Sequence, residues 1–434
     1  MKKVAFYTLG CKVNQYESEA MCELFLKAGY IQADFEDYAD IYVINTCTVT
    51  SMSDRKSRQI IRRAKKKNPN SLVIVTGCYA QTAPDSVMSI PGVNLVLGTK
   101  DRNRIVEYAE NLINDELSKV CCVSDISKHH EFEDLSVTTY SDRTRAFIKV
   151  QEGCNQFCSY CIIPYARGPI RSRDMHEVLA EAKSLIECGY KEIVLVGIHI
   201  ASYGLDKKNY DLADLINKVG AIEGLDRLRL SSIEPMTLNA EFIKKIKDCK
   251  TLCPHFHLSL QSGCDETLAR MNRKYTTCEY KEIVDTIREH FSDAAITTDI
   301  MTGFPGETEE EIKKTASFVK EIAFADAHIF QYSQRKGTPA DVMQNQVAPN
   351  IKEERSKIIE KITDDSRKAF LDSHIGKTVP VLFEQQCHDN KEFFEGKTLN
   401  YITVRVKTNE DINNQLLNVK LISSNGYYIT GKLD

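Results

Sequence analysis

Three short apolar runs near the start of the chain each lead into a cysteine, and this repeat limits the possible folds more than any other feature. The runs cover residues 4–9, 41–44 and 72–75, and the cysteines after them are Cys11, Cys47 and Cys78. Amphipathic segments at residues 14–28 and 53–67 separate the runs, with Ser51 or Ser53 as the expected cap of the second. The order strand, helix, strand predicts parallel strands with right-handed crossovers. All three cysteines are therefore expected at one sheet edge, beyond the carboxyl ends of the strands.

Three thiols at one sheet edge allow two interpretations. Cysteine thiolates are the usual ligands of iron–sulfur clusters. Cysteine is also among the residues most often buried for packing alone. Spacings of 36 and 31 residues are too wide for a local metal motif, so the pattern leaves both interpretations open.

A second set of cysteines has the tight spacing C-x3-C-x2-C. Cys154, Cys158 and Cys161 follow an apolar run at residues 147–150. A four-iron cluster normally takes four cysteines, so three of them leave one iron open to a small molecule. A structural zinc site needs a fourth Cys or His, and the nearest histidines are His130 and His176. The spacing therefore favours an iron–sulfur cluster over zinc.

Length and composition limit the class of protein. A chain of 434 residues is expected to form two to four domains. Its composition, 42 % hydrophobic and 27 % charged, is typical of globular proteins, and no apolar run approaches the roughly 18 residues of a membrane span. We expect a cytoplasmic protein with no membrane partner. Its fifteen cysteines would then be reduced, which favours metal ligation over disulfides.

Strand and helix patterns continue to alternate through the middle of the chain. Strands are predicted at residues 147–150, 193–196, 228–230, 256–260, 295–301 and 327–331, and helices at 175–188, 211–222, 240–249, 276–290 and 308–322. Six βα units predict a partial, TIM-like (β/α)6 barrel. Functional groups are expected at the carboxyl ends of its strands.

The C-terminal region has a different pattern. A charged helix is predicted at residues 352–371, followed by short strands at 379–383, 393–394, 401–406, 416–421 and 427–430. Five such strands predict a small all-β barrel. The expected fold class is α/β, with a parallel α/β domain at 1–115, an acidic linker at 116–143, the partial barrel at 144–371 and the β barrel at 372–434.

The predicted helix at residues 53–67 is strongly basic. Arg55, Arg58, Arg62 and Lys66 belong to a block of eight cationic residues that contains a single acid, Asp54. Such a block can bind nucleic-acid phosphates, or it can be the solvated face of an ordinary helix. The sequence leaves both interpretations open.

Taken together, the motifs resemble those of the radical S-adenosylmethionine (SAM) methylthiotransferases. The three-cysteine loop is similar to the cluster loop of radical SAM enzymes. Residues 8–18, TLGCKVNQYES, resemble the opening of the methylthiotransferase N-terminal domain. Residues 394–401, FEGKTLNY, resemble the TRAM domain, an RNA-binding module. The resemblance covers about residues 1–434 in the domain order of the family.

The resemblance implies two [4Fe–4S] clusters and SAM as cofactors. Cys154, Cys158 and Cys161 would hold the cluster whose open iron chelates SAM, and Cys11, Cys47 and Cys78 would hold an auxiliary cluster. The residues that match SAM contacts are Tyr160, Gly197, Ser231, Gln261, Ser262, Asp299 and Gly303. Gly303 would shape a turn under the adenine.

The resemblance also implies contacts with RNA or substrate. The expected residues are Arg55, Arg58, Arg62, Lys66, Arg171, Arg173, Phe394 and Tyr401. Residues 376–434 contain seven basic and seven acidic residues. RNA binding there would therefore need stacking by Phe394 or Tyr401, or help from the basic helix.

Residues 10–17, GCKVNQYE, look most like the branch of the family that acts on N6-threonylcarbamoyladenosine beside the anticodon of tRNA. This implies addition of a methylthio group to carbon 2, with one SAM for radical generation and one as methyl donor. The further partners would be a sulfur source and an electron donor such as flavodoxin or ferredoxin. A site built to pair the threonyl carboxylate would reject an apolar prenyl group. The alternatives are isopentenyladenosine, a ribosomal-protein aspartate, or an iron–sulfur RNA-binding protein without turnover.

Overall fold

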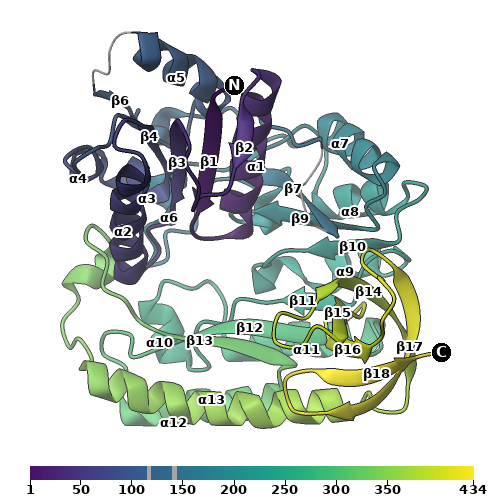
Figure 1. Ribbon diagram of the computed structural model, residues 1–434. Helices are drawn as coiled ribbons and strands as arrows, with labels where there is room; N and C mark the ends of the chain where they lie inside the picture. Colours follow the sequence, from purple (N-terminus) through teal and green to yellow (C-terminus); the bar gives the residue numbers. More distant parts are fainter. Residues whose placement is uncertain (115–118, 139–143) are drawn as a thin grey trace.

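The computed structural model describes residues 1–114, 119–138 and 144–434 (Figure 1). The N-terminal sheet, in purple to dark blue, lies above β12 (Ala295–Thr302) and β13 (Asp326–Gln331), and the C-terminal barrel, in yellow, lies beside β10 (Arg227–Leu230) and β11 (His255–His257). The long helix α13 (Pro349–Asp372) runs along the opposite side of the molecule from the N-terminal sheet. No helix within these ranges is long and apolar enough to cross a membrane.

The N-terminal unit is a parallel six-stranded sheet with the order β2-β1-β3-β4-β5-β6. Its strands are β1 (Lys3–Thr8), β2 (Ile31–Ala33), β3 (Ile41–Thr46), β4 (Leu72–Gly77), β5 (Leu95–Leu97) and β6 (Val120–Cys122). Its helices are α1 (Lys12–Lys27), α2 (Ser51–Lys67), α3 (Cys78–Thr82), α4 (Pro84–Met88) and α5 (Ile105–Asn114). The predicted parallel α/β unit is thus confirmed.

Strands β3 and β4 lie in the middle of this sheet and are buried on both faces, because successive side chains point into two different cores. Ile44 packs with residues of α2 on one face, whereas Val43 packs with residues of α1 and α5 on the other. The N-cap of α2 is Thr50 and neither of the predicted serines. Its hydroxyl accepts a hydrogen bond from the Ser53 N–H at 3.1 Å.

Part of the segment predicted as a linker at 116–143 belongs to the packed structure. Its strand β6 pairs with β5, and its side chains Leu135 and Val137 are buried in the main core of the central unit. The hydroxyl of Tyr16, on α1, donates a hydrogen bond to the Leu135 carbonyl at 2.8 Å. The described part of the segment therefore helps to hold the N-terminal sheet on the central unit. Residues 115, 116 and 143, where domain bounds were predicted, lie outside the described residues.

The central unit contains the six predicted parallel strands. One sheet combines β7 (Arg145–Glu152), β9 (Glu192–Gly197) and β10 with the short antiparallel β8 (Arg171–Ser172), and the other combines β11, β12 (Ala295–Thr302) and β13 (Asp326–Gln331). Isolated parallel bridges, Leu228 with Leu252 and Ile233 with Leu258, connect the two sheets. This is the strand order of a partial (β/α)6 barrel, as predicted.

Helices accompany these strands and share one large core with them. They are α6 (Ile163–Arg167), α7 (Met175–Glu187), α8 (Leu212–Gly220), α9 (Ala240–Ile246), α10 (Asp265–Arg270), α11 (Thr277–His290) and α12 (Glu309–Ile322). Helix α6 comes directly after the cysteine loop and packs against α3 of the N-terminal unit. The two units therefore meet where their cysteines lie.

The C-terminal unit is a closed five-stranded barrel with the order β14-β15-β16-β18-β17, as predicted. Its strands are β14 (Thr378–Gln386), β15 (Phe393–Lys397), β16 (Thr403–Lys407), β17 (Leu416–Ser424) and β18 (Ile429–Leu433). It docks at the amino ends of the central strands, where Arg227 donates to the carbonyls of Lys397 and Pro380 at 2.8 and 2.9 Å. The carboxyl ends of the strands stay free for a site.

Candidate functional site

The three cysteines of the N-terminal unit lie at the carboxyl edge of its sheet. Cys11 precedes α1, Cys47 follows β3, and Cys78 is the first residue of α3. A Cβ on Gly10 would lie 2.9 Å from the Cβ of Cys47, so the absence of a side chain at Gly10 lets Cys11 and Cys47 approach. Burial raises the pKa of Cys78 to about 12, and charge on Cys47 and Cys11 acts in the same direction. The structure thus brings this triad together.

The three cysteines of the C-x3-C-x2-C motif lie on the loop after β7, at the carboxyl end of the first barrel strand. The loop is held by hydrogen bonds from Cys154 N–H to the Gly168 carbonyl at 3.0 Å and from Cys161 N–H to the Cys158 carbonyl at 2.9 Å. Burial raises the pKa of Cys161 to about 12, with smaller contributions from Cys158 and Cys154. This second triad is therefore compact as well.

One thiol of each triad accepts a hydrogen bond from an arginine, and the arginine differs between the two triads. The Nε of Arg167 lies 3.1 Å from the Sγ of Cys78, and the Nη1 of Arg273 lies 3.4 Å from the Sγ of Cys158. Cationic neighbours favour the thiolate form, whereas burial without them would oppose it. Such surroundings fit the thiolate ligands of an iron–sulfur cluster at each triad.

The spacing of the thiols bears on the kind of metal site that each triad could form. In the described part of the chain, no three His, Cys, Asp or Glu side chains are placed to hold one metal ion. A four-iron cluster binds each thiolate through a different iron, so its ligands spread more widely than the ligands of a single ion.

Arg167 also belongs to a buried ionic network between the two units. Its Nη1 lies 2.6 Å from Glu17 on α1 and 2.9 Å from Glu152 at the end of β7. Burial alone would raise the pKa of Glu17, but Arg102, Arg167 and Lys149 together lower it to about 2. The network joins the N-terminal sheet to the cysteine loop of the barrel.

A cavity of about 370 Å³, hereafter the first cavity, borders Cys161 of the second triad and the segment just after Cys47 of the first. Cys161 and Tyr160 line one side, and Val49 and Thr50, which follow Cys47, line another. Two further residues predicted to contact SAM, Gln261 and Asp299, also line this cavity. The structure thus gathers Tyr160, Gln261 and Asp299 beside Cys161.

The other residues predicted to contact SAM do not line the first cavity. Ser262 is buried and shares a hydrogen bond of 3.3 Å with Thr315 of α12. Gly303 has a φ of +70° and lies against the side chain of Lys352, which agrees with a turn-forming role. Gly197 ends β9 and lies against Gln151.

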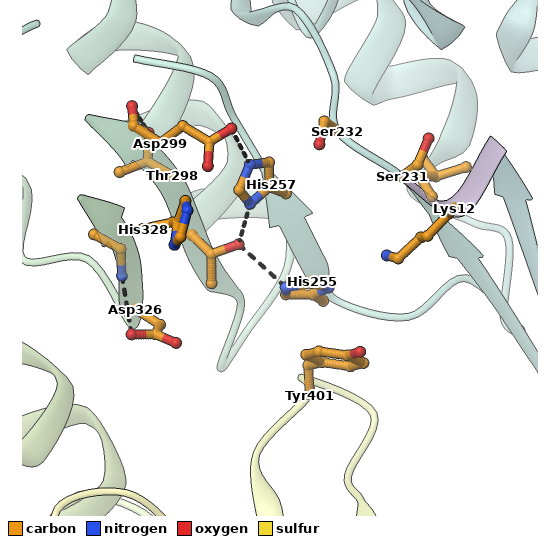
Figure 2. Close-up of a pocket in the computed structure, with 13 residues that line it drawn as sticks. Lys12, Ser231, Ser232, His255, His257, Thr298, Asp299, Asp326, His328 and Tyr401 are labelled. Atoms are coloured by element: carbon orange, nitrogen blue, oxygen red, sulfur yellow. Dashed lines mark hydrogen bonds and ion pairs between the residues drawn. The ribbon is translucent and has the colours of Figure 1, made fainter. Parts of the chain in front are cut away.

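A cavity of about 390 Å³, hereafter the second cavity, lies next to the first and shares Asp299 and His328 with it (Figure 2). The Thr297 hydroxyl lies 3.2 Å from His255 and 3.0 Å from His257. Its other lining residues include Lys12, Ser231, Ser232, Thr298, Asp326 and Tyr401. Ser231, predicted to contact SAM, belongs to this cavity.

Sequence reasoning missed Lys12 and the histidines of the second cavity. His255 and His257 are two positions apart in β11, so their side chains point to the same side of the strand. Two histidines with this period in a predicted barrel strand could have indicated an inward polar pair.

The basic residues of α2 remain candidates for RNA binding. Arg55, Arg62 and Lys66 are exposed, and Arg58 donates to the Tyr79 hydroxyl at 3.2 Å. By contrast, two other cations of α2, Arg63 and Lys67, pair with Glu36. Arg55, Arg62 and Lys66 thus lie on a face of α2 that is separate from the face paired with Glu36.

Four other residues predicted to contact RNA or substrate point into the structure and not onto its outer surface. Arg171 donates to the Arg167 carbonyl at 2.8 Å, and Arg173 pairs with Glu181; both arginines are buried. Phe394 is 5 % exposed because it points into the core of the C-terminal barrel. Tyr401 stacks on His255, with ring centroids 4.7 Å apart, at the second cavity.

Comparisons with known proteins agree with this architecture. A family model described as the radical SAM superfamily matches residues 148–319, and one described as uncharacterized protein family UPF0004 matches residues 3–98. The chain is 44 % identical to the threonylcarbamoyladenosine tRNA methylthiotransferase MtaB of Bacillus subtilis, over all of this chain and 96 % of that protein. It is 36 % identical to the tRNA-2-methylthio-N(6)-dimethylallyladenosine synthase of Clostridium novyi, over all of this chain and 96 % of that protein.

Among solved structures, the chain is similar to the radical SAM methyltransferase TsrM of Kitasatospora setae. The TM-score is 0.58 at 15 % identity, and the match covers 79 % of this chain and 77 % of that one. At this identity the likeness supports the fold alone.

Proposed function

The chain belongs to the radical SAM methylthiotransferase family, and we propose that it adds a methylthio group to carbon 2 of N6-threonylcarbamoyladenosine beside the anticodon of tRNA. Relatives named for the threonylcarbamoyl substrate are 44 %, 40 % and 37 % identical, and the relatives named for the dimethylallyl substrate that we compared are 34–36 % identical. These identities support the choice of substrate.

The observation that carries this proposal is the first cavity, which borders Cys161 of one cysteine triad and the segment just after Cys47 of the other. Cys161 itself lines the cavity, and so do Val49 and Thr50, which come just after Cys47 in the chain. Cys161 and Cys47 are 114 positions apart. A base held there would lie beside both triads, as addition of a sulfur group to an unactivated C–H bond requires. Anticodon-loop bases are single-stranded and can be turned out into such a cavity.

Membership of the family implies a [4Fe–4S] cluster and SAM, for which we assign Cys154, Cys158 and Cys161. We further propose that Cys11, Cys47 and Cys78 hold a second [4Fe–4S] cluster. When bound, these cofactors supply the radical, the sulfur site and, from a second SAM, the methyl group.

The residues of the chain would bind, position and enclose these groups. Arg273 and Arg167 would balance the negative charge of ligated thiolates at the two triads. Tyr160 and Gln261 would form the walls around SAM in the first cavity. The packing of α6 on α3 would hold the two triads at a constant separation.

The proposed partners follow from this chemistry. The exposed cations of α2 would bind tRNA phosphates. A one-electron donor such as flavodoxin or ferredoxin and a source of sulfur would be needed for each turnover, and both are found in the cytoplasm, where we place the protein.

The test is mass spectrometry of nucleosides from the tRNA of cells with and without the gene. The proposal requires selective loss of the 2-methylthio derivative of threonylcarbamoyladenosine. Loss of the isopentenyl derivative instead would keep the reaction and change the substrate. If tRNA is unchanged and the purified, reduced protein forms no 5′-deoxyadenosine from SAM, a non-catalytic iron–sulfur RNA-binding role would replace the proposal.

A further inference from the structure

The second cavity contains a charged group that no described side chain neutralises. Of its two carboxylates, Asp299 accepts a hydrogen bond of 3.1 Å from His257, and Asp326 pairs with Arg367 at 3.2 Å. Among its lining residues Lys12 is the only lysine or arginine, and no carboxylate of the described ranges lies within 4.0 Å of its Nζ. An ammonium removed from water without a counter-ion is unfavourable, so this position suits an anionic ligand.

Two more polar atoms in this cavity lack partners. The Oγ of Ser231 and the Nδ1 of His255 are buried, and neither has a hydrogen-bond partner among the described residues. Buried polar atoms are nearly always paired in folded proteins, so unpaired ones at a cavity indicate a ligand that completes them. Glu192 does not neutralise Lys12, because Glu192 already forms an ion pair with Arg229, with 2.7 Å between the Arg229 Nε and the Glu192 Oε1.

The shape of the cavity fits a substituent that extends from the first cavity. Figure 2 shows Lys12 entering from the side opposite Asp299 and His328, and the flat ring of Tyr401 lying below His255. Asp299 and His328 line both cavities, so a base in the first could extend a side group past them towards Lys12.

We propose that the second cavity binds the threonyl group of N6-threonylcarbamoyladenosine, with Lys12 as the counter-ion of its carboxylate and Ser231 and His255 as partners of its polar atoms. This inference rests on the proposed function and makes Lys12 a specificity-determining residue. An isopentenyl group has neither charge nor polar atoms, so it would leave all three groups buried and unpaired. The cavity would thus select the acidic nucleoside.

Binding of synthetic anticodon stem-loops tests the inference apart from catalysis. The probes carry N6-threonylcarbamoyladenosine, its neutral methyl ester, or the isopentenyl nucleoside, and their Kd values are measured at one fixed salt concentration. The wild-type protein should bind the acid about tenfold to a hundredfold more tightly than the ester, the usual range for a hydrogen-bonded charge. The Lys12→Gln variant should bind the acid and the methyl ester with similar Kd values.

Two variants serve as matched controls. Lys12→Arg keeps the charge and should keep part of the preference for the acid. Lys27→Gln changes an exposed lysine at the other end of α1, which pairs with Glu23, and should keep all of it. Iron content is measured for every variant, because Lys12 follows Cys11 in the chain.

The outcomes separate the two proposals. If Lys12→Gln keeps the wild-type preference for the acid over the ester, the role of Lys12 is overturned while the proposed function stands. If the wild-type protein itself shows no such preference and binds the isopentenyl probe best, both are overturned. Loss of the preference in Lys12→Gln, with iron content unchanged, supports both.

Discussion

The Nε of Arg167 lies 3.1 Å from the Sγ of Cys78, although 89 positions separate the two residues in the chain. Arg167 ends the short helix that follows the C-x3-C-x2-C loop, and Cys78 begins the helix that follows β4. One guanidinium therefore connects the cysteine loop of the barrel with the cysteine triad of the N-terminal sheet. Through it, the two halves of the candidate site share one buried cation.

Replacing Arg167 with alanine should strongly destabilise the protein, because Glu17 and Glu152 would remain buried without this partner. Breaking a buried ion pair from one side typically costs about 3–5 kcal/mol. Urea unfolding measures the change. Arg104→Ala, which removes an exposed pair with Glu107, is the control and should leave the midpoint unchanged. Equal midpoints for the two variants would contradict the structural role of Arg167.

Replacing Cys11, Cys47 and Cys78 together with alanine should remove one cluster and leave the other. We expect about four fewer iron atoms per reconstituted chain, as one [4Fe–4S] cluster holds. The variant should still form 5′-deoxyadenosine from SAM and reductant, since Cys154, Cys158 and Cys161 remain.

The control for the iron measurement replaces three cysteines with no assigned role, Cys121, Cys188 and Cys278, all exposed. Their substitution should leave the iron content as in the wild type. An unchanged iron content in the Cys11, Cys47 and Cys78 variant would refute the second cluster.

Stability should fall as the pH decreases below neutral, in part because of His199. Burial, together with the nearby Arg273, lowers the pKa of His199 from 6.5 to about 4. The unfolded chain therefore binds a proton at a higher pH than the folded protein does, so this contribution is present above pH 6.5 and is lost as the pH falls towards 4. Between pH 7.5 and 5 the loss should be about 2 kcal/mol.

Denaturant unfolding at several pH values checks the role of His199. His199→Gln, which keeps a polar group near Ser202, should flatten the pH dependence relative to the wild type. The control variant His388→Gln, at an exposed position, should leave the pH dependence of stability as in the wild type. The same slope in all three proteins would show that His199 does not titrate in this way.

Replacing Arg55, Arg62 and Lys66 with glutamine should weaken tRNA binding and reduce its dependence on salt. Each phosphate that is no longer neutralised should lower the slope of log K against log salt by about 0.7, hence by about 2 for three phosphates. The control changes Arg63 and Lys67 on the same helix, which already pair with Glu36. Similar slopes for the two variants would identify this face of α2 as an ordinary solvated surface.

The sequence alone was sufficient to predict the type of each unit and the order of its main strands, although it did not indicate the short strands β2, β5 and β6 of the N-terminal sheet. Short continuous apolar runs, typical of buried strands, precede Cys11, Cys47 and Cys78. The alternation of strand and helix patterns in the middle of the chain predicts the six barrel strands. These features depend on local spacing, which the chain displays directly. The C-x3-C-x2-C motif could be recognised for the same reason.

Only the tertiary structure decided which way individual side chains point and which distant residues meet. Phe394 and Arg173 looked available for RNA, but strand alternation and ion pairing turn them inward. Lys12, Ser231 and His255 come from separate parts of the chain, and they line one cavity because the N-terminal unit packs against the barrel. Contacts of this kind depend on how whole units pack, which no local pattern in the sequence records.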